Sequence, residues 1–373
     1  MTARDRLSVL WLVKGLGPGG AERLLTTAAS VHDHSSFRFE AAYLLPWKDH
    51  LVGELAARGV PSTCLEVHRE LDLRWARRLR RLLVERRVDV LHSHSPYPAG
   101  VARLVARSLP RRTRPKLVYT LHNRWQSFAW PTRVLNGLTL PLDDADLAVS
   151  SDVRATVRPR LRSHIEVVVH GIALEEARGA AARAETRAEL GLGDEDVAIG
   201  TVANFRAQKN YPNLFEAAEI LRGRGVPFRL VAVGQGPLEE EMRALHSRMG
   251  LDDVVSLLGY RDDAVRVMSA CDVFTLASDH EGIPVAVMEA LALGLPVVAT
   301  RVGGVSEAIT DDVEGVLVPP RSPEMLADAW QRVVTDAALR ARLAAAAARR
   351  APAFDVRTAV RRIEDVYRQV TGR

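Results

Sequence analysis

The chain has 373 residues, enough for two domains of ordinary size, and its 47% hydrophobic and 26% charged residues are typical of globular proteins rather than of disordered or fibrous ones. Its two cysteines, Cys64 and Cys271, are too few for a disulfide framework or a cysteine zinc site, which favours a cytoplasmic protein. The net charge of +5 divides unevenly, because residues 1–170 carry 27 Arg and Lys against 16 Asp and Glu, whereas residues 171–373 carry 24 against 30.

Short apolar segments alternate with amphipathic helical segments along the chain, which predicts parallel α/β architecture. The first segment, Leu7–Val13, is too short to span a membrane and lacks the small residues of a signal-peptide cleavage site. In the first half we expect strands at Leu7–Val13, Phe37–Leu45, Pro61–Val67, Val88–His92, Lys116–Leu121, Leu147–Val149 and Ile165–Val169. In the second half we expect them at Val197–Ala203, Phe228–Val233, Val254–Leu257, Val273–Leu276, Val297–Ala299 and Gly315–Val318. Helices fill most of the gaps, and only helical segments follow Pro320.

The alternation of expected strands and helices is interrupted between His170 and Val197, where the sequence is rich in Ala, Arg and Glu. We therefore predict an N-terminal domain over residues 1–170 and a C-terminal domain over residues 171–352. A terminal helical segment, 353–373, follows a break at Pro352. Two α/β domains of similar size make the cleft between them the expected ligand site.

A glycine-rich loop, Gly15-Leu16-Gly17-Pro18-Gly19-Gly20, follows the first expected strand and leads into a helix. Its glycine spacing is that of dinucleotide-binding loops, where backbone N–H groups approach a diphosphate at a helix start. NAD binding also needs an acidic residue at the end of the second strand, and that strand ends Leu44-Leu45-Pro46-Trp47-Lys48 without one. A tight turn, or a loop that closes on another phosphate or a sugar, therefore stays open beside the NAD interpretation.

The segment Glu281–Ala290 holds two carboxylates, Glu281 on a loop and Glu289 in the second turn of an expected helix. Pro284 suits the first helical turn, and the free N–H groups of Val285 and Ala286 favour an anion there. A nucleotide-sugar needs such a site, because its phosphates meet N–H groups and its diols donate to carboxylates. The alternative is a solvated Glu289 and a capping Glu281.

A basic loop, Asn204-Phe205-Arg206-Ala207-Gln208-Lys209-Asn210, follows the first expected strand of the second half. Arg206 and Lys209 stand where parallel sheets bind ligands, and both suit a phosphate. The chain has only four lysines, so Lys209 is the more informative of the two, although two solvated surface charges are also possible.

Histidines follow two neighbouring expected strands, with His92 and His94 at the end of the fourth and His122-Asn123 after the fifth. This edge of a parallel sheet faces the ligand crevice, so His122 is a candidate hydrogen-bond donor or polarising group. The spacing of His92 and His94 does not favour a metal site, and ordinary loop histidines are the alternative.

The helical segment Leu71–Arg87 is strongly basic, with an apolar stripe formed by Leu73, Ala76, Leu79, Leu82 and Leu83. It is either a sheet-covering helix with a basic outer face or a patch that meets an anionic membrane surface. Nucleic acid is a weaker interpretation, because aromatic residues do not alternate with the arginines.

Taken in order, these segments resemble the retaining family-4 glycosyltransferases of the GT-B fold. The resemblance rests on Gly17–Glu22, Asp89–His94, Tyr119–Asn123, Val168–Ile172, Arg206–Asn210, Val233–Pro237, Glu281–Glu289 and Val302–Glu307. The segments most specific to this family are Glu281–Glu289 and the upstream basic loop Arg206–Asn210. Three residues depart from the usual family pattern: His170 stands where Asn is common, Asn210 where Gly is common, and Pro284 removes one N–H group.

The resemblance implies two Rossmann-like domains facing across a cleft, with the last helix crossing back to the first domain. It implies that Arg206 and Lys209 neutralise the donor diphosphate, that Glu289 binds ribose and that Glu281 holds a sugar hydroxyl. It places His122 beside the transferring centre and makes Glu281, Arg206, Lys209 and His122 the expected catalytic set. Further donor contacts are expected from Gly19, Gly20, Gly282, Ile283, Val285 and Ala286, and acceptor contacts from His92, His94 and Asn123.

The resemblance therefore implies transfer of a sugar from a UDP- or GDP-sugar to an acceptor hydroxyl. We expect no metal or other cofactor, because the expected phosphate-binding segments contain no Asp-x-Asp metal motif. We expect a lipid-linked or polysaccharide acceptor at the inner membrane face, with peripheral attachment through Leu71–Arg87. A soluble natural-product acceptor is the alternative, and a nucleotide-sugar epimerase or a basic membrane-binding protein is a second one.

Overall fold

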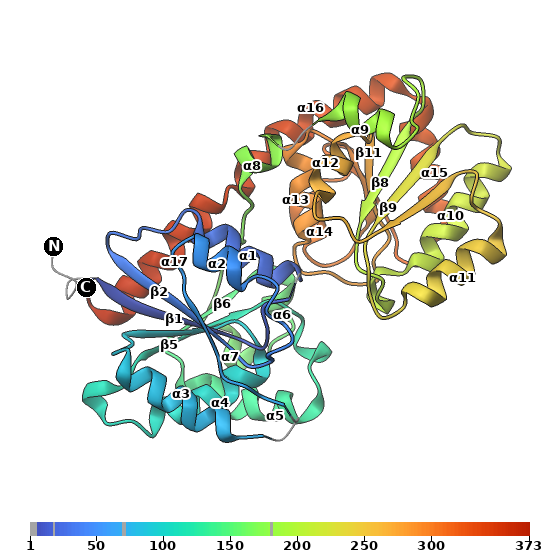
Figure 1. The fold of residues 1–373 in the computed structure, drawn as a ribbon. Coiled ribbons are helices and arrows are strands. Elements are labelled where there is room, and N and C mark those ends of the chain that lie inside the picture. The colour runs from blue at the N-terminus through green and yellow to red at the C-terminus, as the bar shows by residue number, and fades with distance from the viewer. Residues whose placement is uncertain (1–5, 18, 69–71, 180–181) are drawn as a thin grey trace. The chain divides into compact units, whose positions relative to one another are not determined.

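The computed structural model describes residues 6–17, 19–68, 72–179 and 182–373. The chain forms two compact units: unit 1 comprises Met1–Gly171 and Val356–Arg373, and unit 2 comprises Ile172–Asp355. Each unit is built on an all-parallel sheet with helices around it (Figure 1). The predicted α/β class with two Rossmann-like domains is confirmed.

Unit 1 contains a seven-stranded sheet in the order β3-β2-β1-β4-β5-β6-β7. Its strands are β1 Leu7–Val13, β2 Phe37–Tyr43, β3 Ser62–Cys64, β4 Val90–Ser93, β5 Lys116–Leu121, β6 Ala145–Ala148 and β7 Ile165–Val167. Its α-helices are α1 Gly20–Ala29, α2 Val52–Ala57, α3 Arg74–Glu85, α4 Pro96–Arg107, α5 Trp130–Thr139, α6 Ser151–Ala155, α7 Pro159–Arg162 and α17 Val356–Thr371. Short 3₁₀ turns lie at η1 Arg111–Thr113, η2 Trp125–Ser127 and η3 Leu140–Leu142.

Unit 2 contains a six-stranded sheet in the order β10-β9-β8-β11-β12-β13. Its strands are β8 Ala198–Val202, β9 Arg229–Val233, β10 Val255–Gly259, β11 Val273–Leu276, β12 Val297–Thr300 and β13 Gly315–Val318. Its α-helices are α8 Leu174–Gly179, α9 Arg183–Glu189, α10 Tyr211–Gly223, α11 Glu239–Met249, α12 Ala264–Ser269, α13 Val285–Ala292, α14 Val305–Ala308, α15 Pro323–Thr335 and α16 Ala337–Arg350, with 3₁₀ turns η4 Ala207–Lys209 and η5 Ala351–Phe354.

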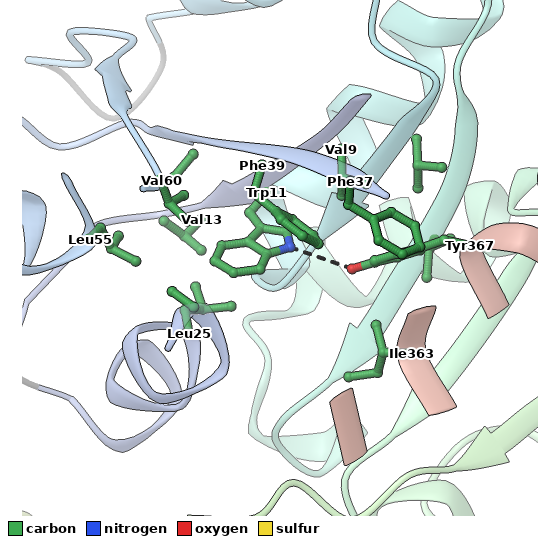
Figure 2. Packing of buried hydrophobic residues seen from close by; sticks show 14 of the residues in the cluster. Val9, Trp11, Val13, Leu25, Phe37, Phe39, Leu55, Val60, Ile363 and Tyr367 are labelled. Carbon is green, nitrogen blue, oxygen red and sulfur yellow. Dashed lines mark hydrogen bonds between the residues drawn. The ribbon is translucent and has the colours of Figure 1, made fainter. Parts of the chain in front are cut away.

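Both faces of β1 are buried, which explains its unbroken apolar sequence. Val9, Trp11 and Val13 face a core completed by α1, α2 and α17, whereas Leu10 and Leu12 belong to the core beneath α3 and α4. On the first face Trp11 Nε1 donates a hydrogen bond to Tyr367 Oη at 3.4 Å, which fixes α17 to the centre of the sheet (Figure 2).

Strand order reverses once in each unit, and these points are where parallel sheets bind ligands. In unit 1 the reversal lies between β1 and β4, and in unit 2 it lies between β8 and β11. The loops that follow these neighbouring strands therefore define one candidate site in each unit.

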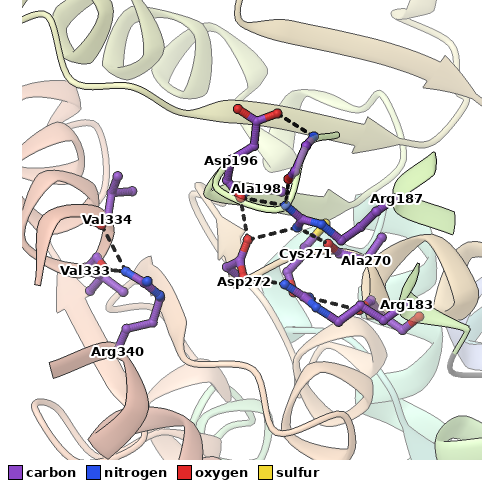
Figure 3. A network of polar contacts seen from close by, with 12 residues as sticks. Arg183, Arg187, Asp196, Ala198, Ala270, Cys271, Asp272, Val333, Val334 and Arg340 are labelled. Atoms are coloured by element: carbon purple, nitrogen blue, oxygen red, sulfur yellow. Dashed lines mark hydrogen bonds and ion pairs between the residues drawn. The ribbon is translucent and has the colours of Figure 1, made fainter. Parts of the chain in front are cut away.

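An arginine–aspartate network holds the opposite, amino-terminal ends of β8 and β11 (Figure 3). Asp272 Oδ2 accepts from the Ala198 amide at 2.8 Å, and Asp272 Oδ1 pairs with Arg183 at 2.5 Å. Arg187 donates to the carbonyls of Ala270 at 3.0 Å and Asp196 at 2.8 Å. Because these contacts fix the starts of both strands, the loops at their far ends are carried on a rigid base.

The basic helix differs in detail from its prediction. Helix α3 runs from Arg74 to Glu85, and Leu71 lies outside the described residues. Leu73 was expected in the buried stripe, but it precedes the helix and is 60% exposed, while Trp75 occupies the buried face. In the described ranges no helix is both long and apolar enough to cross a membrane.

Candidate functional site

The loops after β8 and β9 lie against each other in unit 2. The Phe205 amide donates to the Gln235 carbonyl at 3.2 Å, and the Leu238 amide donates to the Phe205 carbonyl at 3.1 Å. A Cβ on Gly234 would lie 2.0 Å from the Ala203 oxygen, and one on Gly236 would lie 2.5 Å from the Phe205 oxygen. Only glycine fits such an approach, so these two glycines set the position of the basic loop.

Asn210 ends the basic loop and begins α10 in the left-handed conformation, with φ 47° and ψ 54°. Its side chain accepts from the Asn213 amide at 3.3 Å and donates to Asp279 Oδ1 at 2.9 Å. Asparagine is the residue that best tolerates this conformation after glycine, which explains why it can stand at this left-handed position. The bond to Asp279 also ties the basic loop to the loop after β11.

Lys209 and Glu281 meet where these two loops run side by side. Lys209 Nζ lies 2.5 Å from Glu281 Oε1, and the Ser278 hydroxyl donates to the same oxygen at 2.5 Å. Glu281 is buried and Lys209 half-buried. Both hydrogen bonds end at Glu281 Oε1. Glu281 Oε2 and two of the three N–H groups of Lys209 take no part in these two bonds.

Asp279 also holds the loop after β11 in place, through contacts with Asn210 and Arg321. Arg321 Nη2 lies 2.6 Å from Asp279 Oδ2. Burial opposes ionisation of Asp279, but the bonds from Arg321 and Asn210 outweigh it and hold the pKa of the carboxyl below its ordinary value. The loop after β11 is therefore fixed on both sides of His280.

Helix α13 follows this loop, and Pro284 is the residue before it rather than part of its first turn. The helix starts one residue later than expected, because Pro284 has extended backbone angles, φ −74° and ψ 128°. The amides of Val285 and Ala286 stand at the N-terminus as expected, and Glu289 lies half-buried in the second turn.

The remaining expected donor residues lie on the same edge of the unit 2 sheet. Gly282 and Ile283 are half-buried, and a Cβ on Gly304 would lie 2.4 Å from the Gly282 oxygen. Arg206 directly precedes the η4 turn, which ends at Lys209, and the Arg206 side chain is exposed.

In unit 1 the glycine loop lies at the reversal point between β1 and β4. The Lys14 amide donates to Ser95 Oγ at 2.9 Å, and the Leu16 amide donates to the Lys48 carbonyl at 2.7 Å. Gly19 caps α1, which begins at Gly20; Pro18 lies outside the described residues. The loop thus leads directly into a helix N-terminus.

Four histidines form a contiguous cluster in unit 1. Ring centroids are 4.0 Å apart for His92 and His94, 5.4 Å for His94 and His122, and 5.2 Å for His122 and His170. His94 Nδ1 lies 3.2 Å from His122 Nε2. Asn123, the next residue, is exposed.

His92 lies near the end of β4, as expected, and both its ring nitrogens are engaged. Its Nδ1 lies 2.6 Å from Tyr367 Oη and its Nε2 lies 2.8 Å from Thr120 Oγ1. The fully buried His92 ring therefore holds Tyr367 and Thr120 in place. In this conformation neither of its ring nitrogens is available to bind an acceptor substrate, contrary to expectation.

Burial lowers the pKa of His92, His94 and His122 well below the ordinary value of 6.5, and neighbouring imidazoles lower it further. Burial lowers the pKa of His170 to about 4, although a hydrogen bond with the Val168 backbone opposes the shift. The cluster is therefore neutral at pH 7. Within the described ranges, His94 Nε2 and His170 Nδ1 are buried without a hydrogen-bond partner.

Two family models match this chain. The model described as Glycosyltransferase Family 4 matches residues 18–176, and the model described as Glycosyl transferases group 1 matches residues 182–350. Together they match residues of both units, although β1 lies before the first match. The chain belongs to the family-4 glycosyltransferases of the GT-B fold.

The relatives of this glycosyltransferase have several different names. It is 34% identical over 253 residues to D-inositol 3-phosphate glycosyltransferase of Saccharomonospora viridis, covering 64% of this chain and 58% of that relative. It is 25% identical to UDP-Gal:alpha-D-GlcNAc-diphosphoundecaprenol alpha-1,3-galactosyltransferase of Escherichia coli, covering 86% of each. Its fold is similar to Anabaena Alr3699/HepE in complex with UDP and glucose, with TM-score 0.83 and 22% identity over 96% of this chain and 99% of that one.

Several polar residues at the candidate sites of this glycosyltransferase were not predicted from the sequence. Ser278 and Asp279 lie two and three residues after the expected strand Val273–Leu276 of unit 2, and that position could have identified them. Tyr367 and Thr120 bond to His92 from 275 and 28 residues away. No local pattern indicates such partners.

Proposed function

We propose that this glycosyltransferase moves a sugar from a UDP- or GDP-linked donor to an acceptor hydroxyl, with retention of the anomeric configuration and without a metal ion. The observation that carries the proposal is the Lys209–Glu281 pair at the reversal point of the unit 2 sheet. The names of the Escherichia coli relative and of the Anabaena complex both include UDP, which favours UDP as the nucleotide.

The donor diphosphate would bind Arg206, Lys209 and the amides at the start of α13. Lys209 keeps two N–H bonds available while paired, and Arg206 is exposed on the same loop. The helix N-terminus adds partial positive charge, which favours a phosphate at Val285 and Ala286. Gly282 and Ile283 are proposed as further donor contacts in unit 2, and Gly19 and Gly20 as donor contacts in unit 1.

The two glutamates would hold the two ends of the donor. Glu281 Oε1 is occupied by Lys209 and Ser278, so Oε2 is the oxygen proposed to accept from a sugar hydroxyl. Glu289, half-buried in the second turn of α13, is proposed to accept from the ribose diol.

In the proposed reaction the bond between C1 and the phosphate oxygen breaks, and its electron pair leaves with the diphosphate. The acceptor oxygen forms the new bond to C1 on the same face, and its proton passes to the departing phosphate. Cations and N–H groups already aimed at the phosphate lower the barrier, because they need no reorganisation as its charge grows. His122 of unit 1, with its neutral ring held by His94, is proposed as a further catalytic residue.

The acceptor is proposed to be lipid-linked or a growing polysaccharide at the inner membrane face, with His94 and Asn123 as contacts. Both named relatives act on molecules that carry phosphate, a D-inositol 3-phosphate and a diphosphoundecaprenol. A phosphorylated acceptor fits the basic first half of the chain, and the exposed arginines of α3 would face the anionic membrane surface.

Substitution of Lys209 tests the donor site. Lys209→Ala should lower kcat about a hundredfold, or ~3 kcal/mol in the barrier, because one charged donor to the leaving group is lost. Arg224→Ala removes a surface cation of the same unit that pairs with Asp328 and should leave kcat unchanged. Normal turnover by a folded Lys209→Ala protein would refute the assignment.

Titration with a nucleoside diphosphate separates the two glutamates. Glu281→Gln should lower sugar transfer far more than nucleotide affinity, whereas Glu289→Ala should weaken nucleotide affinity itself. The reverse pattern would exchange the two roles. A thermal-shift screen of the parent protein with UDP-, GDP- and dTDP-sugars would identify the donor, because a bound ligand raises the apparent melting temperature.

A further inference from the structure

Helix α5 of unit 1 carries a row of exposed apolar side chains. Trp130 is 70% exposed, Val134 51% and Leu138 75%. They stand four residues apart, so they form one stripe along the outer face of the helix. Exposed apolar residues scattered singly are ordinary, but a tryptophan, a valine and a leucine on one stripe are not.

The inner face of α5 is firmly held, so the stripe is not a packing defect. Asn136 Nδ2 donates to the Pro96 carbonyl at 2.8 Å, and Arg103 of α4 donates to Asn136 Oδ1 at 2.8 Å and to Thr139 Oγ1 at 3.2 Å. Asn136 and Thr139 are buried. The helix therefore presents its apolar stripe outward in a fixed orientation.

The stripe belongs to a wider layer formed by α3, α4 and α5, which pack in that order (Figure 1). Among the residues that the structure describes, six of the ten exposed large apolar side chains lie on this layer: Leu73, Val84, Leu104, Trp130, Val134 and Leu138. Beneath them, α3 and α4 bury their own apolar faces against the sheet. The layer therefore exposes apolar side chains beyond what the core requires.

The same layer is strongly basic. Residues 74–142 contain 15 Arg and Lys and only two acidic residues, Glu85 and Asp89. Arg77, Arg80 and Arg81 of α3 are exposed, as is Arg112 of the η1 turn. A second copy of this chain would bring a surface of the same sign, whereas an anionic bilayer supplies the opposite charge.

We propose that the α3–α4–α5 layer docks on an anionic membrane surface and that Trp130, Val134 and Leu138 insert at the boundary between headgroups and acyl chains. Tryptophan prefers this boundary, because its ring is apolar and its N–H group stays near water. The arginines of α3, on the other side of α4 in the same layer, contact lipid phosphates. The inference adds the inserting element to the membrane location proposed above, but vesicle binding does not require the proposed transfer reaction.

Co-sedimentation with vesicles tests the docking. The full chain should bind vesicles of phosphatidylglycerol and phosphatidylcholine, and binding to phosphatidylcholine alone should be at least tenfold weaker. Replacing the stripe by Trp130→Ser, Val134→Ser and Leu138→Ser together should weaken binding to the anionic vesicles at least tenfold. A matched variant of exposed apolar residues in unit 2, Val313→Ser with Met325→Ser, should bind like the parent.

Two further measurements make the result decisive. Tryptophan fluorescence should shift to the blue on vesicle binding in the parent but not in Trp130→Phe, which should still bind. The stripe variant should keep its melting temperature and its thermal shift with UDP, so loss of vesicle binding is separate from loss of the donor site. Unchanged vesicle binding by a folded stripe variant, or a parent dimer that this variant converts to monomers, would overturn the proposal.

Discussion

Replacing His170 should make unit 1 less sensitive to acid. The His170 ring is buried beside His122, at a centroid distance of 5.2 Å, and its Nδ1 is one of the buried atoms without a partner in the described ranges. Asparagine is the chosen substitute because it is polar, smaller than histidine and uncharged at every relevant pH.

The magnitude follows from proton linkage. Burial lowers the pKa of His170 from 6.5 to about 4, so between these values the unfolded chain binds a proton that the folded chain excludes. The contribution of the neutral His170 ring to the free energy of unfolding is therefore fully present above about pH 6.5. It is lost as the pH falls from 6.5 toward 4. Between pH 7.5 and pH 5 the loss from this one group is about 2 kcal/mol.

Urea unfolding at pH 7.5 and pH 5, followed by tryptophan fluorescence, measures this loss. Five of the six tryptophans lie in unit 1, so the signal reports mainly that unit. In His170→Asn the difference in unfolding free energy between the two pH values should shrink by about 2 kcal/mol, whereas His164→Asn, at an exposed position, should leave it unchanged. An identical pH dependence in parent and His170→Asn would refute a buried neutral His170.

Three further substitutions test the local geometry. Asn210→Gly should lower the unfolding free energy by about 1 kcal/mol, because it keeps φ 47° without strain but loses the bonds to the Asn213 amide and Asp279. Asn210→Val should lower it by about 2–3 kcal/mol in urea titrations, because a β-branched residue loses the same bonds and also resists φ 47°. Gly236→Ala should reduce kcat at least tenfold by pushing away the loop after β8, and Gly223→Ala, whose Cβ meets nothing within 4 Å, is its control in an activity assay. Arg103→Met should cost about 3–5 kcal/mol in thermal or urea unfolding, because it leaves Asp143 buried without its cation, and a smaller loss would mean that water reaches the carboxylate.

The strands of this protein could be predicted because a parallel strand buried on both faces is an unbroken apolar segment. Leu7–Val13 illustrates this, since every residue is buried and the strand has the predicted ends. Ends were less certain where polar residues flank the strand, as at the short strand Ser62–Cys64, expected over Pro61–Val67. There Leu65 and Val67 are still buried, but Glu66 between them is exposed with φ 50°, and this change of backbone direction ends the regular pairing with β2.

The candidate site could be predicted as far as loops and strand ends define it. Lys209 and Glu281 are 72 residues apart in sequence, yet they meet because β8 and β11 are neighbours at the reversal of strand order. The sharing of one oxygen, Glu281 Oε1, by Lys209 and Ser278 could not be predicted, because it depends on side-chain rotamers. The role of Tyr367 was equally hidden, since its position on α17 is set by packing of the whole helix against the sheet.

The Lys209–Glu281 pair bears directly on how the proposed donor site can be ready before its ligand arrives. A buried carboxylate alone would be costly, and a lone lysine would spread over many rotamers. Paired at 2.5 Å, each charge satisfies the other and both side chains are held in one place. If a diphosphate then binds the remaining N–H bonds of Lys209, little side-chain ordering is left to oppose binding, so more of the electrostatic attraction can act on the growing charge of the leaving group.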